Sequence, residues 1–105
     1  MNEKIMQAIM GLIIYGGDAK SNAMEAIEFA KCYDFEQAEE KLKAANESLT
    51  FAHNSQTDML VAEAQGEENS ITLLLVHSQD HLMTSITFTD LAKEIVDLYK
   101  VMNSK

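Results

Sequence analysis

The sequence predicts an all-α fold, an antiparallel three-helix bundle. The 105 residues contain no proline and only four glycines, so nothing forces frequent turns. Apolar residues recur at spacings of three and four in three long segments, which is the periodicity of helices with one buried face. Short connections between these segments make consecutive helices antiparallel neighbours. We therefore expect one domain over residues 1–105.

The first helix is predicted over residues 3–31. Gly16 and Gly17 lie inside it and cost up to about 2 kcal/mol relative to alanine. We expect another backbone to approach the helix closely at this pair. The predicted apolar face consists of Ile5, Ile9, Met10, Leu12, Ile13, Ala23, Met24, Ile27 and Ala30.

The second helix is predicted to begin after Asp34, a good N-cap with Gln37 three residues later, and to run to about Gln65. Gly66 is expected to cap its C-terminus, and residues 66–70 to form a short acidic link. A heptad pattern runs through Phe35, Ala38, Leu42, Ala45, Leu49, Ala52, Gln56 and Met59. Gln56 falls on this apolar seam and needs a polar partner, which we expect near the third helix.

The third helix is predicted from Ile71 or Thr72 to Met102, and three ionisable residues interrupt its apolar start. His77, Asp80 and His81 fall within one arc of roughly 100°. We expect this arc to be the buried stripe of the helix, together with Leu73, Thr84, Phe88, Leu91, Ile95, Leu98 and Met102. Buried charge without a partner costs several kcal/mol, so the cluster needs a compensating interaction.

The face opposite this stripe changes character along the third helix. Its second half is charged, but its first half carries Leu75, Val76, Leu82, Met83 and Ile86. A three-helix bundle cannot cover both faces of one member. We therefore expect this half to pack against other subunits in a closed ring about a shared axis.

Composition limits the classes of function. The net charge is −9, and all eight basic residues are lysines, so nucleic-acid binding is not expected. No apolar run approaches the ~18 residues of a membrane span, and no signal peptide is recognisable, so a cytoplasmic protein is expected. Cys32 is the single cysteine, so an intramolecular disulfide is impossible, and we interpret it as a small packing residue.

Three interpretations of the cluster remain open from the residues alone. It could be a structural hydrogen-bond network across an interface. It could be a metal site, with His77 and His81 as ligands at i and i+4 and Asp80 as a third. It could also hold a nucleophilic histidine that accepts a phosphoryl group, since neighbouring apolar side chains would slow hydrolysis of the P–N bond.

The segment 76–85, VHSQDHLMTS, closely resembles the signature of the lactose/cellobiose-type enzyme IIA of the bacterial sugar phosphotransferase system. Two further stretches agree with this family, residues 11–14 together with 17–21, and residues 52–57. The residues that flank His77 are more similar to the cellobiose/chitobiose branch than to the lactose branch.

This resemblance implies a phosphocarrier that serves the uptake of a β-linked disaccharide of the cellobiose, chitobiose or lactose type. It implies a nine-helix homotrimer in which His77 accepts a phosphoryl group from the carrier protein HPr and passes it to a cysteine of the IIB component. The membrane component IIC takes part indirectly. His81 and Gln79 are expected to support His77.

The resemblance also implies a divalent cation on the trimer axis, held by Asp80 of each subunit. Three carboxylates in an apolar interface repel one another unless a cation or protons neutralise them, and hard oxygen ligands suit Mg²⁺. The alternative function from another class is a non-catalytic helical trimerisation or adaptor module, in which the His-Asp cluster only binds a structural metal. The role of His53 is open, with a structural role favoured over an active-site role.

Overall fold

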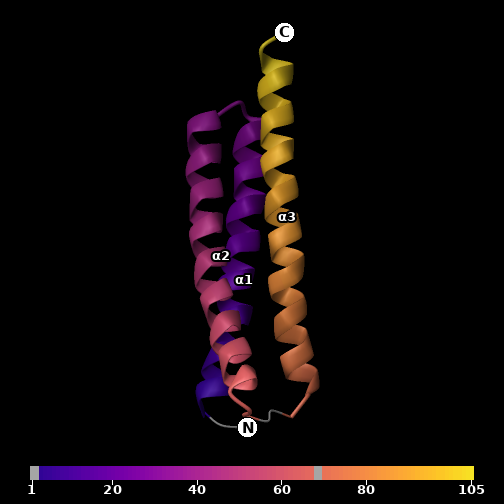
Figure 1. The fold of residues 1–105 in the computed structure, drawn as a ribbon. Helices are drawn as coiled ribbons and strands as arrows, with labels where there is room; N and C mark the ends of the chain where they lie inside the picture. Colours follow the sequence, from indigo (N-terminus) through magenta and orange to yellow (C-terminus); the bar gives the residue numbers. More distant parts are fainter. Residues whose placement is uncertain (1–2, 68–69) are drawn as a thin grey trace.

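The computed structural model describes residues 3–67 and 70–105, and these residues form three long α-helices and no strand. The helices are α1 (Glu3–Lys31), α2 (Phe35–Ala64) and α3 (Leu73–Asn103). They run up, down and up in a bundle of 56 × 18 × 18 Å (Figure 1). The predicted helices are confirmed, with ends that differ by at most two residues. In the predicted link, residues 68 and 69 lie outside the described residues.

Side-chain caps fix where α2 and α3 begin. Oδ1 of Asp34 accepts a hydrogen bond of 3.2 Å from the backbone N–H of Gln37, as the sequence predicts. Oγ1 of Thr72 accepts one of 3.1 Å from the N–H of Leu75 and starts α3. Each cap satisfies a backbone donor that the first turn of a helix leaves without a partner.

Left-handed residues end the first two helices. Gly66 has φ +89°, and the N–H groups of Gly66 and Glu67 bond back to the last turn of α2, which confirms the predicted cap. α1 ends in the same way. The N–H of Tyr33 donates a hydrogen bond to the backbone oxygen of Ala30, and the N–H of Asp34 donates one to that of Phe29. Here, however, the left-handed residue is Tyr33, at φ +61°, where glycine is usual.

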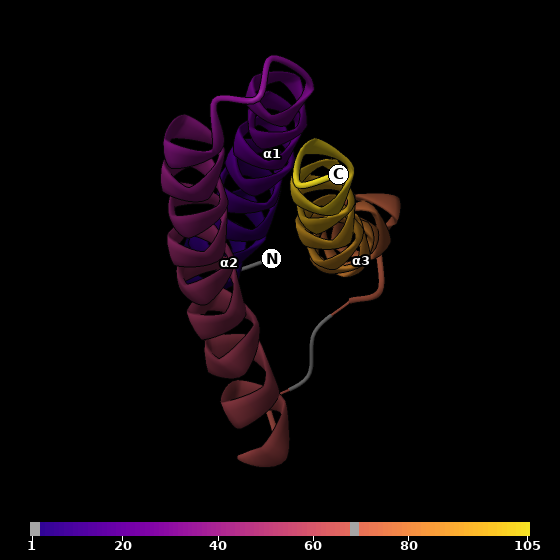
Figure 2. The same ribbon diagram turned by 90° about the horizontal axis from the view of Figure 1, so that it is seen from above.

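α1 is the central element of the bundle, with α2 on one side and α3 on the other (Figure 2). Two apolar clusters fill the interior along its length. The cluster nearer the α1–α2 turn is rich in alanine, with Ala19, Ala23, Ala26, Ala30, Ala38, Ala45 and Ala92. The cluster at the opposite end has larger side chains, including Ile5, Ile9, Leu12, Met59 and Leu82. Most of the predicted faces of α1 and α2 are confirmed, but Met10 and Met24 are 41% and 46% exposed.

The buried face of α3 is not the predicted one. It consists of Ser78, Leu82, Ser85, Thr89, Ala92 and Val96. Most of the expected stripe lies on the outside instead, with Leu73 85% exposed and Leu91 and Leu98 each 56% exposed, whereas Phe88 and Ile95 are half-buried against the core. Four of these six residues are serine, threonine or alanine, and among them Ala92 packs in the alanine-rich cluster of α1. The sequence predicts that the stripe with Leu73, Leu91 and Leu98 lies inside the bundle, and this prediction is wrong. Of the face predicted to lie outside, Leu82 is fully buried, whereas Val76 and Met83 are exposed.

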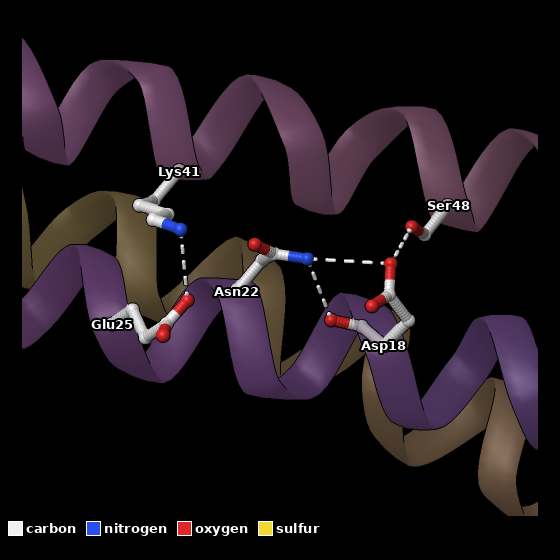
Figure 3. A network of polar contacts seen from close by, with 5 residues as sticks. All are labelled: Asp18, Asn22, Glu25, Lys41 and Ser48. Atoms are coloured by element: carbon white, nitrogen blue, oxygen red, sulfur yellow. Dashed lines mark hydrogen bonds and ion pairs between the residues drawn. The ribbon is translucent and has the colours of Figure 1, made fainter.

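Polar contacts join α1 to α2 outside the core (Figure 3). Ser48 Oγ is nearly buried and donates a short hydrogen bond to Oδ2 of Asp18. Nδ2 of Asn22 donates to the same oxygen at 3.3 Å and to the backbone oxygen of Asp18 at 3.0 Å. One turn further along, Nζ of Lys41 lies 3.1 Å from Oε2 of Glu25. These contacts fix the register of α1 against α2.

Two further expectations concern membranes and the cysteine. Across residues 3–67 and 70–105, each helix is too polar or too short in its apolar runs to cross a membrane. Cys32 is exposed in the turn after α1, so its interpretation as a packing residue is wrong. It lies beyond the last buried position of α1, Ala30.

Candidate phosphoryl-transfer site

The two histidines of the cluster meet on the outer side of α3. His77 is exposed and His81 is half-buried. One helical turn separates them, and their ring centroids lie 4.5 Å apart with an angle of 75° between the planes, an edge-to-face contact. In the single chain, the ring of His77 is thus exposed on the outer side of α3 and in contact with that of His81.

Apolar side chains surround the exposed imidazole. Leu73, Leu74 and His77 line a shallow apolar hollow at the start of α3. Val76 and Met83 are 53% and 55% exposed on the same part of the helix. Such neighbours limit the access of water once a partner covers the site, which is the environment that a labile phosphohistidine requires.

Asp80 lies on the outer stripe of α3 with its carboxylate exposed. Its backbone oxygen accepts a hydrogen bond of 2.8 Å from Oγ1 of Thr84. Among the described residues of one chain, no three His, Cys, Asp or Glu side chains converge to hold a metal ion. Asp80 can therefore offer one oxygen-donor group per chain, which fits a cation shared between chains and not a site made by His77, Asp80 and His81 of a single chain.

Gln79 points away from the histidines. Its Oε1 accepts a hydrogen bond of 2.9 Å from Nε2 of Gln56 on α2, and its Nε2 lies 3.9 Å from Sδ of Met59. This confirms the prediction that Gln56 has a polar partner near the third helix. Because Gln79 follows His77 by two residues, about 200° around the helix, its amide lies across α3 from the ring of His77.

The backbones of α1 and α3 approach each other behind His81. A Cβ atom built on Gly16 would lie 3.4 Å from the carbonyl oxygen of His81 and 3.5 Å from Oγ of Ser85. The expected close approach at the glycine pair is confirmed for Gly16. It is wrong for Gly17, where a Cβ would meet nothing within 4 Å. Ser85 was not among the predicted site residues, and the glycine pair was the sequence signal for a contact at this level.

The third histidine lies apart from this site. His53 is exposed on α2 and lines a shallow groove between α2 and α3 together with Asn46, Leu49, Thr50, Asn54, Thr57 and Ile86. Its backbone oxygen accepts a hydrogen bond of 3.0 Å from Oγ1 of Thr57. The structure does not bring His53 to His77 and His81.

Residues 7–100 match the family described as PTS system, Lactose/Cellobiose specific IIA subunit. The chain belongs to this family. The protein is therefore a component of the sugar phosphotransferase system (PTS), an enzyme IIA of the lactose/cellobiose type. This identity argues against the alternative of a non-catalytic adaptor module.

Individual relatives agree with the family. The chain is 49% identical over 100 residues to the lichenan-specific phosphotransferase enzyme IIA component of Bacillus subtilis, covering 95% of this chain and 91% of the relative. The crystal structure of the PTS cellobiose-specific enzyme IIA from Bacillus anthracis has a TM-score of 0.95 and 43% identity, covering 100% of this chain and 96% of that one.

A third relative was solved with a partner. It is the IIA(Chitobiose) of Escherichia coli in the IIA(Chitobiose)–HPr complex, with a TM-score of 0.83 and 34% identity. The match covers 97% of this enzyme IIA and 99% of that chain. The fold on which His77 and His81 lie is thus that of an enzyme IIA seen with HPr.

Proposed function

We propose that this enzyme IIA accepts a phosphoryl group from phospho-HPr on His77 and passes it to a cysteine of the IIB component. This relay would serve the uptake of a β-linked disaccharide of the cellobiose, chitobiose or lactose type. The observation that carries the proposal is the imidazole of His77, which is exposed, surrounded by apolar side chains and in edge contact with His81. The HPr complex of a related IIA supports HPr as the donor.

The chemistry at His77 is a displacement at phosphorus. A ring nitrogen of His77 carries the attacking lone pair, the new P–N bond forms, and the P–N bond to the HPr histidine breaks. His81 orients the ring of His77 through the edge contact. In the second step, the thiolate of IIB attacks the phosphorus atom from the side opposite His77. The P–S bond forms, and the P–N bond to His77 breaks.

The chain contains no arginine, the side chain that binds phosphoryl oxygens with two parallel hydrogen bonds. We infer that basic residues of HPr stabilise the charge of the transferring group. Replacing basic residues around the HPr histidine should slow transfer to His77, and an unchanged rate would remove this inference.

The outer face of α3 supports a homotrimer. It carries exposed apolar side chains at Leu73 and, beyond the turns with His77, Asp80 and Thr84, at Leu91, Leu98 and Met102. Covering one leucine contributes roughly 1.5–3 kcal/mol, so three copies that share this face about one axis would be strongly favoured. The assembly would have nine helices, with the three α3 helices innermost.

Asp80 would lie on the axis of this trimer. One carboxylate from each subunit then meets two others, and their repulsion needs a divalent cation, for which we propose Mg²⁺. The cation would neutralise the buried charge. The three Asp80 side chains would supply its protein ligands.

Gln79 can support the reaction only from a neighbouring subunit. Its amide lies on the α2 side of its own helix, bonded to Gln56, while His77 lies on the outer side. We infer that, in the proposed trimer, the α2–α3 edge of one copy faces the outer side of α3 of the next. The site would then combine His77 and His81 of one chain with Gln79 of another. The relay places the protein in the cytoplasm, beside IIB and, through it, the membrane component IIC.

Phosphorylation by purified PTS components tests the proposal. The protein is incubated with labelled phosphoenolpyruvate, enzyme I and HPr, and acid-labile, alkali-stable phosphate is measured. The three histidines provide matched variants, because His53→Ala removes an exposed imidazole away from the site. We expect full labelling of His53→Ala, slowed labelling of His81→Ala and none of His77→Ala. Label on His77→Ala, or none on the parent, would overturn the proposal.

A further inference from the structure

One buried hydrogen bond joins α3 to α1 at the level of the histidines. Oγ of Ser85 donates it to the backbone oxygen of Gly16 over 2.8 Å, and Ser85 is 1% exposed. Ser85 follows His81 by one turn, and a Cβ atom built on Gly16 would lie 3.4 Å from the carbonyl oxygen of His81. The bond therefore fixes the turn that presents His81.

This bond is not needed to satisfy the backbone. The carbonyl of Gly16 lies inside α1, where the N–H four residues later already bonds to it. A serine is also a weaker helix former than the alanine that would fit the same buried position. The hydroxyl of Ser85 thus adds a directional contact where an apolar residue would suffice for packing.

Ser78 shows the contrast on the same helix. It is fully buried on the same face of α3, but its Oγ donates to the backbone oxygen of Leu75 within its own helix, over 2.7 Å. Ser78 therefore makes no hydrogen bond to α1 that could fix the orientation of α3. Of the two buried serines nearest the histidine pair in the sequence, Ser78 bonds within α3 and Ser85 bonds to α1.

We propose that Ser85 is a positioning residue for phosphoryl transfer. Its bond to Gly16 fixes the rotation and height of α3 against α1, and with them the position in which the turn that carries His77 and His81 meets the incoming phosphoryl group. This role rests on His77 being the phosphorylated residue, as proposed above. Misplacement of a reacting group by about 1 Å can cost on the order of a hundredfold in rate, so a contact of this kind has a measurable effect.

Two matched variants test the role. Ser85→Ala and Ser78→Ala each remove one buried hydroxyl from the inner face of α3, and circular dichroism and sedimentation establish that both keep the fold and the assembly of the parent. In single-turnover transfer from phospho-HPr, we expect Ser85→Ala to lower the saturating rate by about tenfold, with the half-saturating concentration unchanged. Ser78→Ala should transfer at the parent rate, and Ser85→Thr, which keeps the hydroxyl, should be faster than Ser85→Ala.

The position of the histidine turn against α1 is measured without any partner. In the parent and in Ser78→Ala, we expect a strong nuclear Overhauser effect between the Hα protons of Gly16 and the Hβ protons of residue 85, and a weaker one in Ser85→Ala. An unchanged signal between the two helices in Ser85→Ala, or a saturating rate equal to that of Ser78→Ala, overturns the role of Ser85. A parent that accepts no phosphate overturns the proposed function instead, and the signal between the helices still decides whether Ser85 positions the histidine turn.

Discussion

Nε2 of Gln56 donates a hydrogen bond of 2.9 Å to Oε1 of Gln79, and this bond joins α2 to α3 beside the histidine turn. Both amides are half-buried, so the pair satisfies two polar groups that lie on otherwise apolar helix faces. Together with the bond from Ser85 to Gly16, it attaches the start of α3 to both other helices. The histidines are thereby held on the outer side of α3.

The Gln56–Gln79 pair should show energetic coupling. Gln56→Ala and Gln79→Ala should each lower the free energy of unfolding by about 1 kcal/mol, because each leaves the other amide without its partner. The double variant should lose less than the sum, by roughly 0.5–1 kcal/mol. Urea unfolding of all four proteins at one protomer concentration measures the cycle. Strict additivity would show that the bond contributes nothing.

Thr89→Val should stabilise the protein. Thr89 is 2% exposed, and its Oγ1 is buried without a hydrogen-bond partner among the described residues. Valine has nearly the same shape and removes the unsatisfied hydroxyl, so we expect a gain of about 1 kcal/mol. Thermal unfolding gives the comparison. Thr89→Ser, which keeps the hydroxyl and loses the methyl group, should be less stable than the parent.

Tyr33→Gly should also stabilise the protein, by up to about 1 kcal/mol. Tyr33 has φ +61°, a conformation that is unfavourable for a residue with a Cβ atom and free of strain for glycine. The gain is reduced by the loss of the edge contact between the rings of Tyr33 and Phe35, 6.2 Å apart. Tyr33→Ala keeps the backbone strain and loses the ring contact, so its Tm should fall. A Tm of Tyr33→Gly below that of Tyr33→Ala would contradict this account.

Replacement by alanine should change the free energy of unfolding in opposite directions at Gly17 and at Gly66. At Gly17 a Cβ meets nothing within 4 Å inside a helix, so Gly17→Ala should gain up to about 1 kcal/mol. At Gly66, φ is +89°, so alanine should lose about 1 kcal/mol. Chemical denaturation of the two variants measures both changes in the free energy of unfolding. A loss at Gly17 would indicate that another subunit packs against it.

Asp80→Leu tests the proposed cation without removing the apolar stripe. A leucine at this position should keep or strengthen the trimer, because it replaces a carboxylate that must be neutralised when buried. Binding of Mg²⁺ should be abolished. Sedimentation equilibrium gives the mass of the assembly, and calorimetric titration gives the binding of the cation.

Asp90→Leu is the matched control for Asp80→Leu, because Asp90 is exposed on the charged side of the same helix. It should keep both the trimer and the binding of Mg²⁺. A monomeric Asp80→Leu would mean that the cation, and not the apolar stripe, holds the subunits together.

Local features of the fold were predictable because they depend on neighbours in the sequence. Asp34 caps α2 and Gly66 ends it, and each effect requires only a few adjacent residues. The histidine pair was predictable for the same reason, since a spacing of four residues on a helix places His77 and His81 one turn apart. In contrast, nothing local distinguishes Tyr33 as the left-handed residue at the end of α1.

The sequence by itself determined three helices, their ends, and the placement of His77 and His81 one turn apart on the third helix. Only the tertiary structure decided which face lies inside the bundle. An apolar stripe has the same periodicity whether it contacts its own chain or another, and the decision came from the fit of small residues, such as Ser85 against Gly16, between closely spaced helices. That fit placed His77 on the outside of the bundle.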